Sequence, residues 1–127
     1  MSQNDFTEPT TAYWQEILSE DQLKSSQKSA PWQYGVPVTL PDLRYLVLPI
    51  RPLNNATNDA VVSLLVNQAS ISVVEELGTF LADLVRPFEV EVVIGLPTLG
   101  LSLAPIVAMG LGQGKYYHIE ISCCVGF

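Results

Sequence analysis

The chain has 127 residues, of which 48% are hydrophobic and only 15% are charged. One domain with a core is expected at this length, but the charged share is low for a small free-standing protein. Either the chain oligomerises, or it is a fragment whose apolar faces are covered by more protein. The formal net charge of -7 and the scattered distribution of the six cations argue against nucleic-acid binding.

Residues 1–41 are polar and are predicted to form a short helix followed by a connector. Apolar side chains recur at helical spacing near the start, at Tyr13, Trp14, Ile17 and Leu18. This helix is expected to pack on the body of the domain, with a lid or a dimer contact as the alternatives. The Ser-, Pro- and Gly-rich connector that follows is expected to be held to a surface by Trp32 and Tyr34. The stretch has no apolar signal region, so a cytoplasmic protein is expected.

The middle of the chain predicts one strand and two helical stretches. A compact apolar run at 43–50, closed by Pro49 and Pro52, predicts a strand at a sheet edge. Two helical stretches are expected from residue 60, the first of them short. In the second, Ser72 and Glu75 form a capping box. Its apolar stripe, ended by Arg86-Pro87, comprises Val73, Val74, Leu77, Phe80, Leu81, Leu84 and Val85.

A second strand and a helix of small residues follow. The run at 88–97 contains the consecutive β-branched residues Val92, Val93 and Ile94, which is typical of a central strand covered on both faces. A helix is expected over 103–111, with Pro105 in its first turn. Glycines and prolines interrupt this apolar region, so it is not expected to span a membrane. The order of helix, strand, loop and helix predicts an α/β fold with a partial parallel sheet flanked by helices.

The turn at Thr98, Leu99 and Gly100 is the candidate binding site. Ligands of open α/β sheets bind at the carboxyl ends of the strands, where free amides and the helix dipole favour an anion. Gly100 would allow a close backbone approach or a positive φ. Phosphate or pyrophosphate is the ligand that such a turn would bind, but these residues by themselves favour a purely structural turn between strand and helix. The motifs G-x-x-x-x-G-K-S/T and G-x-G-x-x-G are both absent, which also disfavours a dehydrogenase fragment.

The stretch SVVEELGTFLADLVRPFEVEVVIGLPTLGLSLAPIVAMGLG, residues 72–112, resembles the first half of a type I phosphoribosyltransferase core. It is most similar to adenine phosphoribosyltransferase-like members, with 92–98 as the strand end and Thr98-Leu99-Gly100 as the pyrophosphate loop. The resemblance implies transfer of ribose 5-phosphate from phosphoribosyl pyrophosphate to a purine base, with release of pyrophosphate. It also implies that loop amides hold the pyrophosphate and that Mg2+ neutralises its charge.

Two departures from that family pattern affect the expected activity. Leu99 stands where many relatives carry Lys or Arg. The family's second signature, paired acids before a Thr- or Ser-bearing glycine loop, has no counterpart after Gly100, where Glu120 is the only acid. The pairs Glu20-Asp21 and Glu75-Glu76 are interpreted as solvated surface and helix cap. No catalytic residue or metal ligand is assigned, and the chain is expected to bind pyrophosphate weakly and to be inactive alone.

The tail at 115–127 does not continue the family pattern. Gly114-Lys115-Tyr116 can be encoded GGT-AAG-TAY, which contains the donor-like sequence GTAAGT, and we hypothesise that a retained intron encodes the tail. Alternating apolar residues in the tail also predict a strand. Cys123 and Cys124 lack the spacing of a disulfide or zinc site, and His118 has no placed carboxylate partner.

The sequence therefore divides into residues 1–41, a polar helix and connector, and 42–127, an incomplete phosphoribosyltransferase-like domain. The alternative function is non-enzymatic. In that interpretation, the N-terminal aromatic helix and the surplus apolar surface serve homo-oligomerisation or docking.

Overall fold

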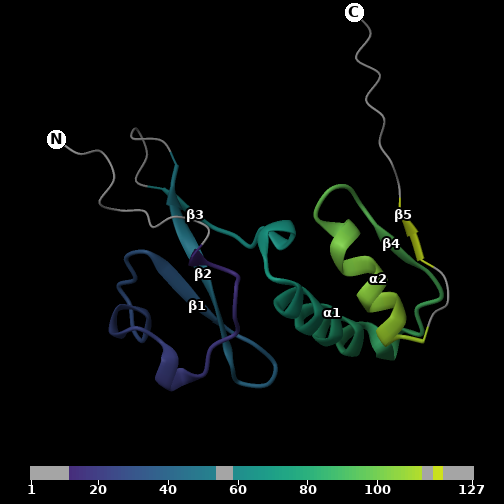
Figure 1. Cartoon of the computed structure of the whole chain (residues 1–127), viewed down its shortest axis with the longest axis horizontal. Helices are drawn as coiled ribbons and strands as arrows, with labels where there is room; N and C mark the ends of the chain where they lie inside the picture. Colours follow the sequence, from purple (N-terminus) through teal and green to yellow (C-terminus); the bar gives the residue numbers. More distant parts are fainter. Residues whose placement is uncertain (1–11, 54–58, 113–115, 119–127) are drawn as a thin grey trace, which may run out of the picture. The chain divides into compact units, whose positions relative to one another are not determined.

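The computed structural model of the protein describes residues 12–53, 59–112 and 116–118 (Figure 1). These residues form an α/β structure that divides into two compact units, with the division after Val73. The boundary expected at residue 41 falls inside the first unit. Residue 41 lies between two strands that pair with each other, so both strands belong to the same unit.

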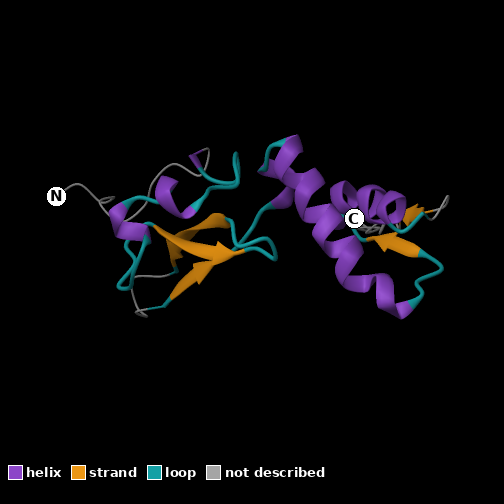
Figure 2. Ribbon diagram, turned by 90° about the horizontal axis from the view of Figure 1, so that it is seen from below, coloured by secondary structure: helices purple, strands orange, loops and turns teal. Residues whose placement is uncertain are grey.

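The first unit contains a three-stranded antiparallel sheet, drawn in orange in Figure 2. Its strands are β1 (Gly35–Thr39), β2 (Tyr45–Pro52) and β3 (Ala60–Val62), in the order β1-β2-β3. The prediction of a parallel sheet is wrong for this unit. The strand expected at 43–50 exists as β2, but it is the central strand and not an edge. Of the two helical stretches expected from residue 60, the first is present only as a three-residue 3-10 helix at Val66–Gln68, because residues 60–62 form β3.

β2 can contain Pro49 and Pro52 although it is the central strand. Neither proline lies at a position where a backbone N–H would have to bond to β1 or to β3. The Ile50 N–H donates to the Tyr34 oxygen at 2.9 Å, so this amide faces the β1 side. By alternation, the Pro49 nitrogen faces the β3 side, one residue beyond the last β3 pair, Ile50–Val62. The Pro52 nitrogen faces the β1 side, where pairing has already ended. A proline is tolerated in a strand where no ladder bond is required.

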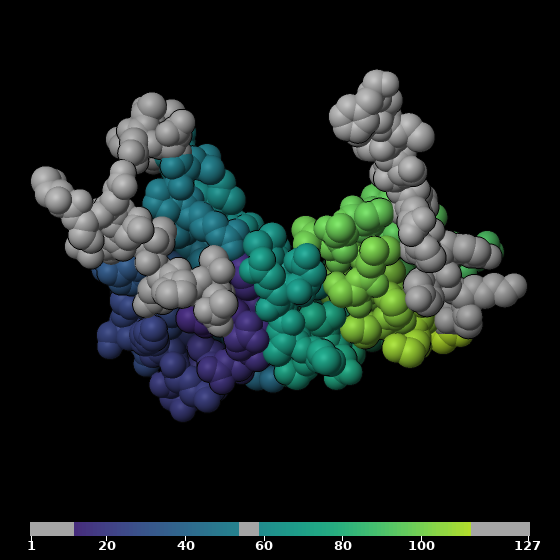
Figure 3. Space-filling model, turned by 45° about the horizontal axis from the view of Figure 1, so that its top comes forward, coloured from purple at the N-terminus to yellow at the C-terminus, as the bar shows by residue number. Residues whose placement is uncertain are grey.

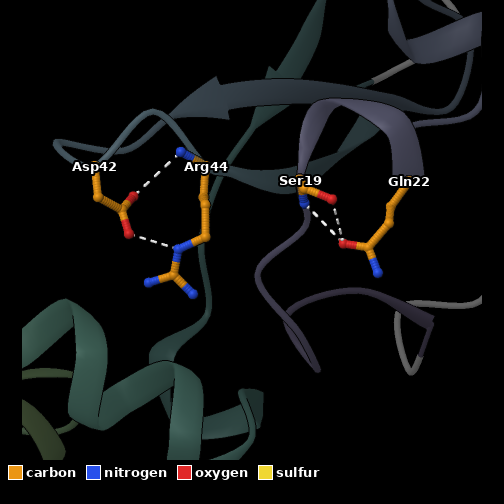
Figure 4. Close-up of polar contacts among 4 residues, drawn as sticks. All are labelled: Ser19, Gln22, Asp42 and Arg44. Atoms are coloured by element: carbon orange, nitrogen blue, oxygen red, sulfur yellow. Dashed lines mark hydrogen bonds and ion pairs between the residues drawn. The ribbon is translucent and has the colours of Figure 1, made fainter.

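A tight turn joins β1 to β2. The Leu43 N–H donates to the Leu40 oxygen at 3.0 Å, and Leu43 has a positive φ of 69°. Asp42 accepts hydrogen bonds from the amide and the side chain of Arg44 (Figure 4). Burial raises the pKa of Asp42, but the Arg44 contacts outweigh this effect and hold that pKa below its usual value. The Pro41-Asp42 pair suits the two central positions of such a turn.

The core of the first unit is built on its N-terminal segment. Its buried cluster comprises Tyr13, Trp14, Leu23 and Val47. The helix expected at Tyr13–Leu18 is wrong. Trp14 has a φ of 61°, which no right-handed helix contains, and Leu18 forms an antiparallel bridge with Tyr45 through two 2.8 Å hydrogen bonds. Burial of the aromatic rings against the sheet thus overrides the helical spacing of the sequence.

The second unit contains α1 (Ile71–Val85), β4 (Val93–Gly95), α2 (Gly100–Gly110) and β5 (Tyr116–His118). β4 and β5 pair in parallel, which is the one parallel pairing among the residues that the structure describes. The expected end of α1 before Arg86-Pro87 is confirmed. Its N-cap is Ser70 and not Ser72, because the Ser70 Oγ accepts the Val73 N–H at 3.3 Å.

Small residues form the contact between α1 and α2. A Cβ added at Gly78 would lie 2.5 Å from Ile106 Cγ2, and one added at Gly110 would lie 2.7 Å from Ala82 Cβ. The predicted apolar stripe only partly coincides with this face, because Leu84 is 70% exposed. The helices approach closely where their side chains are smallest.

Exchanging the small residues at this contact tests it directly. We expect Gly110→Ala to lower the free energy of unfolding of the second unit by about 1 kcal/mol, because overpacking exceeds the gain in helix propensity. The double variant Ala82→Gly/Gly110→Ala restores the original volume and is expected to recover most of the loss. Denaturant unfolding followed by circular dichroism measures both values. Additive losses in the double variant would contradict the contact.

Candidate functional site

The candidate site lies where β4 leads into α2. β4 ends at Gly95, the four residues at 96–99 are exposed, and α2 begins at Gly100. A helix after the turn is therefore confirmed, although it begins three residues before the expected residue 103. Because of this earlier start, Pro105 lies inside α2 and not in its first turn. The structure places Thr98, Leu99 and Gly100 at the N-terminus of α2, and this helix belongs to the green to yellow-green part of the surface in Figure 3.

Gly95 makes the close approach between strand and helix possible. A Cβ at Gly95 would lie 2.8 Å from the Gly100 oxygen and 2.9 Å from Ala104 Cβ. A Cβ at Gly100 would meet only backbone atoms of Gly95, at 3.4 Å, which is ordinary contact. Gly100 also has no positive φ. Glycine is therefore required by the fold at Gly95 and not at Gly100, which sequence reasoning missed.

The backbone amides of the turn differ in their availability. The Gly100 N–H donates to the Leu96 oxygen at 3.0 Å, so this amide is already satisfied. The remaining donors of the predicted loop are the N–H groups of Thr98 and Leu99. The first-turn amides that follow them have no partner within the helix. The structure thus offers a small set of main-chain donors at the positive end of an eleven-residue helix.

Among the described residues of the second unit, one side chain is cationic, and it does not support these donors. Arg86 is the only Lys or Arg in the stretch 74–112. Its guanidinium contacts Asp83 at 2.9 Å and donates to the Gly110 oxygen at 3.0 Å. Gly110 is the last residue of α2, so Arg86 lies at the end of the helix opposite the turn. Within the described ranges, no group of three or more potential metal-ligating side chains occurs. Within residues 74–112, the groups that give the turn electropositive character are therefore the helix dipole and the amides.

An apolar groove of about 350 Å³ adjoins the turn. It lies between α1, β4 and α2, and its lining includes Leu81, Val92, Ile94, Gly100 and Leu103. Ile94 is 53% exposed, so the expectation that this strand is covered on both faces is wrong for the part of the chain that the structure describes. The groove suits an apolar group and offers no polar side chain to a sugar.

The other sequence candidates lie elsewhere on the described elements or outside the described residues. His118 belongs to β5, where its backbone pairs with Gly95. Glu120, Cys123 and Cys124 lie outside the described residues. Glu75 is exposed on α1, and the capping role expected of it with Ser72 is wrong, because α1 begins at Ile71 and Ser70 caps it.

Comparisons with known proteins return no relative of this chain. No model of a protein family, no curated protein and no solved structure matches it. Among the residues with described positions, none belongs to a helix that is both long and apolar enough to cross a membrane.

Proposed function

We propose that residues 72–112 form the pyrophosphate-binding half of a phosphoribosyltransferase-like domain. The observation that carries this proposal is the passage from β4 through an exposed turn into the N-terminus of α2. The Thr98 and Leu99 amides, together with first-turn amides of α2, would bind the pyrophosphate group. Partners of this half-domain would be phosphoribosyl pyrophosphate or free pyrophosphate, in the cytoplasm.

The chemistry of the family explains why such a turn is useful. Transfer of ribose 5-phosphate to a base breaks the bond to pyrophosphate, and negative charge accumulates on that leaving group. Donors fixed in place before the bond breaks stabilise this charge without reorganisation. Mg2+ would supply the countercharge that the side chains around the turn lack. The paired acids and phosphate loop of the family are absent after Gly100, so we expect the chain alone to release no pyrophosphate from phosphoribosyl pyrophosphate and a purine base.

Charge substitutions at Leu99 test the anion site. Leu99 is 40% exposed at the N-cap of α2, so its replacement disturbs little packing. We expect Leu99→Lys to tighten pyrophosphate binding about fivefold and Leu99→Glu to weaken it about fivefold, because one exposed charge contributes about 1 kcal/mol. Isothermal titration calorimetry at low salt measures both. The dipole of α2 would instead make the Leu99→Glu variant more stable than the Leu99→Lys variant. A change in stability therefore cannot account for tighter pyrophosphate binding by Leu99→Lys.

A lysine at the other end of the helix provides the matched control. Met109→Lys adds the same charge near the C-terminus of α2, where Met109 is 71% exposed. We expect this variant to leave pyrophosphate affinity nearly unchanged. Equal tightening by Met109→Lys and Leu99→Lys would show that only net charge matters, and rapid pyrophosphate release by the unmodified chain would show that a complete active site exists.

The apolar groove favours a second candidate function, non-enzymatic oligomerisation or docking. Val92 and Ile94, which line this groove, are 47% and 53% exposed. Burial of such side chains against another protein would be favourable. Analytical ultracentrifugation separates the two functions, because a stable stoichiometric assembly without pyrophosphate affinity would support docking.

A further inference from the structure

The groove beside the turn is bordered by two helix faces and a strand of the second unit. Its described lining residues are all aliphatic or glycine. Leu81 and Val85 line it from α1, and Leu103 and Val107 line it from α2. The members of each pair are four residues apart, so each pair lies on one face of its helix. With Ile94 of β4, these side chains form a surface that suits the apolar face of a further helix.

The charges next to the groove are mainly acidic. The described part of the second unit contains five carboxylates and one cation. The cation, Arg86, contacts Asp83 at 2.9 Å, so these two charges largely offset each other. Glu89 and Glu91 are both exposed and flank Val90, which lines the groove. Since consecutive Cα atoms are about 3.8 Å apart, both carboxylates lie within about one screening length, 10 Å, of the groove.

This acidic rim, Glu89 and Glu91, distinguishes between the possible occupants of the groove. A second copy is disfavoured, because in a symmetric contact the same surface meets itself and the two acidic rims face each other. A helix that carries Lys or Arg beside its apolar face has the complementary charge.

On the basis of the docking function, we propose that this groove binds a basic amphipathic helix of another protein. The apolar side chains of that helix occupy the space between α1, β4 and α2. Its cations lie near the acidic rim, which precedes β4, whereas the turn proposed to bind pyrophosphate follows β4. The two proposed sites therefore use opposite ends of the strand.

Synthetic helices test this proposal on the full chain. The probe is a peptide of about 18 residues made of Leu, Ala and Lys, with its leucines on one helix face. One control has Glu in place of every Lys, and the other has the same composition with the leucines distributed around the helix. We expect fluorescence anisotropy to show saturable binding of the probe, at least about tenfold tighter than that of either control. Equal affinity for either control, or no saturable binding of the probe, would overturn the proposal.

Two double variants locate the charge contact. Glu89→Gln/Glu91→Gln removes the acidic rim, whereas Glu75→Gln/Glu76→Gln removes the same charge near the start of α1, more than one turn before Leu81. We expect the first variant to weaken probe binding about fivefold and the second to weaken it less than about twofold. Equal losses would show that the probe responds only to net charge, which would also overturn the proposal.

A polar side chain in the groove tests the apolar contact. Ile94→Thr keeps a β-branched residue in β4, and Met109→Thr makes a comparable change at an exposed position outside the lining. We expect the first to weaken probe binding about fivefold and the second to leave it nearly unchanged, with circular dichroism confirming that both variants stay folded. Equal affinity of the two variants for the probe would contradict docking in the groove.

Sedimentation separates this inference from the other proposals. We expect the chain alone to be monomeric and to form a one-to-one complex with the probe. A stable dimer that the probe does not dissociate would show that a second copy occupies the groove, and it would overturn the proposal. Probe binding by a chain that does not bind pyrophosphate would support docking and contradict the anion site.

Discussion

Replacement of Trp14 by alanine is expected to lower the free energy of unfolding of the first unit by about 3–5 kcal/mol. The side chain is 2% exposed and belongs to the cluster that joins the N-terminal segment to β2. Its removal leaves a cavity next to Val47 and also removes the contact with Arg51. Both losses fall on the N-terminal segment, whose described helices are 3-10 turns of three residues, Glu20–Gln22 and Ser25–Gln27.

Trp32 provides the control for this prediction. It has the same side chain in the same unit, but it is 41% exposed, so we expect Trp32→Ala to cost less than about 1 kcal/mol. Denaturant titration with amide signals from β1 and β2 reports on the first unit alone and does not depend on tryptophan fluorescence. Similar losses in the two variants would show that the cluster around Trp14 is not the core of this unit.

The sequence predicts local features of this protein better than its pairings. The end of α1 was predictable because Arg86-Pro87 interrupts a helix through the chemistry of the backbone. Likewise, Gly112 has a positive φ of 72° directly after the C-terminal end of α2, where a glycine commonly terminates a helix. Each of these signals acts within a few residues and requires no knowledge of distant contacts.

Sequence reasoning failed where distant residues decide the structure. Tyr13, Trp14 and Leu18 have helical spacing, but Leu18 instead pairs with Tyr45, which is 27 residues away in the chain. The prolines of β2 indicated an edge strand. Their position within a central strand depends on where the β1 and β3 ladders end, and the sequence of β2 alone does not contain that information.

At the candidate site, too, the features set by neighbouring residues were predictable and those set by distant residues were not. A turn followed by a helix was predictable from the glycines and prolines at 95–100, because these residues favour turns. The apolar groove was not predictable, since it depends on how α1 packs against α2. The cavity that Tyr13 and Trp14 line was not predictable either, because it is assembled from an N-terminal segment whose expected helix does not form.

Substitution by alanine is expected to lower the free energy of unfolding at Gly95, before the turn, but not at Gly100, after it. Gly95→Ala should lower the free energy of unfolding of the second unit by about 2–3 kcal/mol, because the new Cβ would meet the Gly100 carbonyl oxygen at 2.8 Å. That oxygen belongs to the backbone, so α2 must move as a whole to relieve the contact. Gly100→Ala meets nothing closer than 3.4 Å, and it should be neutral or slightly stabilising through helix propensity.

This comparison also separates a role in folding from a role in binding. Movement of α2 in Gly95→Ala would displace the amides of Thr98 and Leu99, so pyrophosphate affinity should fall together with stability. In Gly100→Ala the turn keeps its place, and a fall in affinity without a fall in stability would indicate that the ligand itself approaches the Gly100 Cα. Chemical denaturation and calorimetric titration of the two variants give both quantities. Retention of full stability by Gly95→Ala would contradict the close contact between β4 and α2 on which the whole site depends.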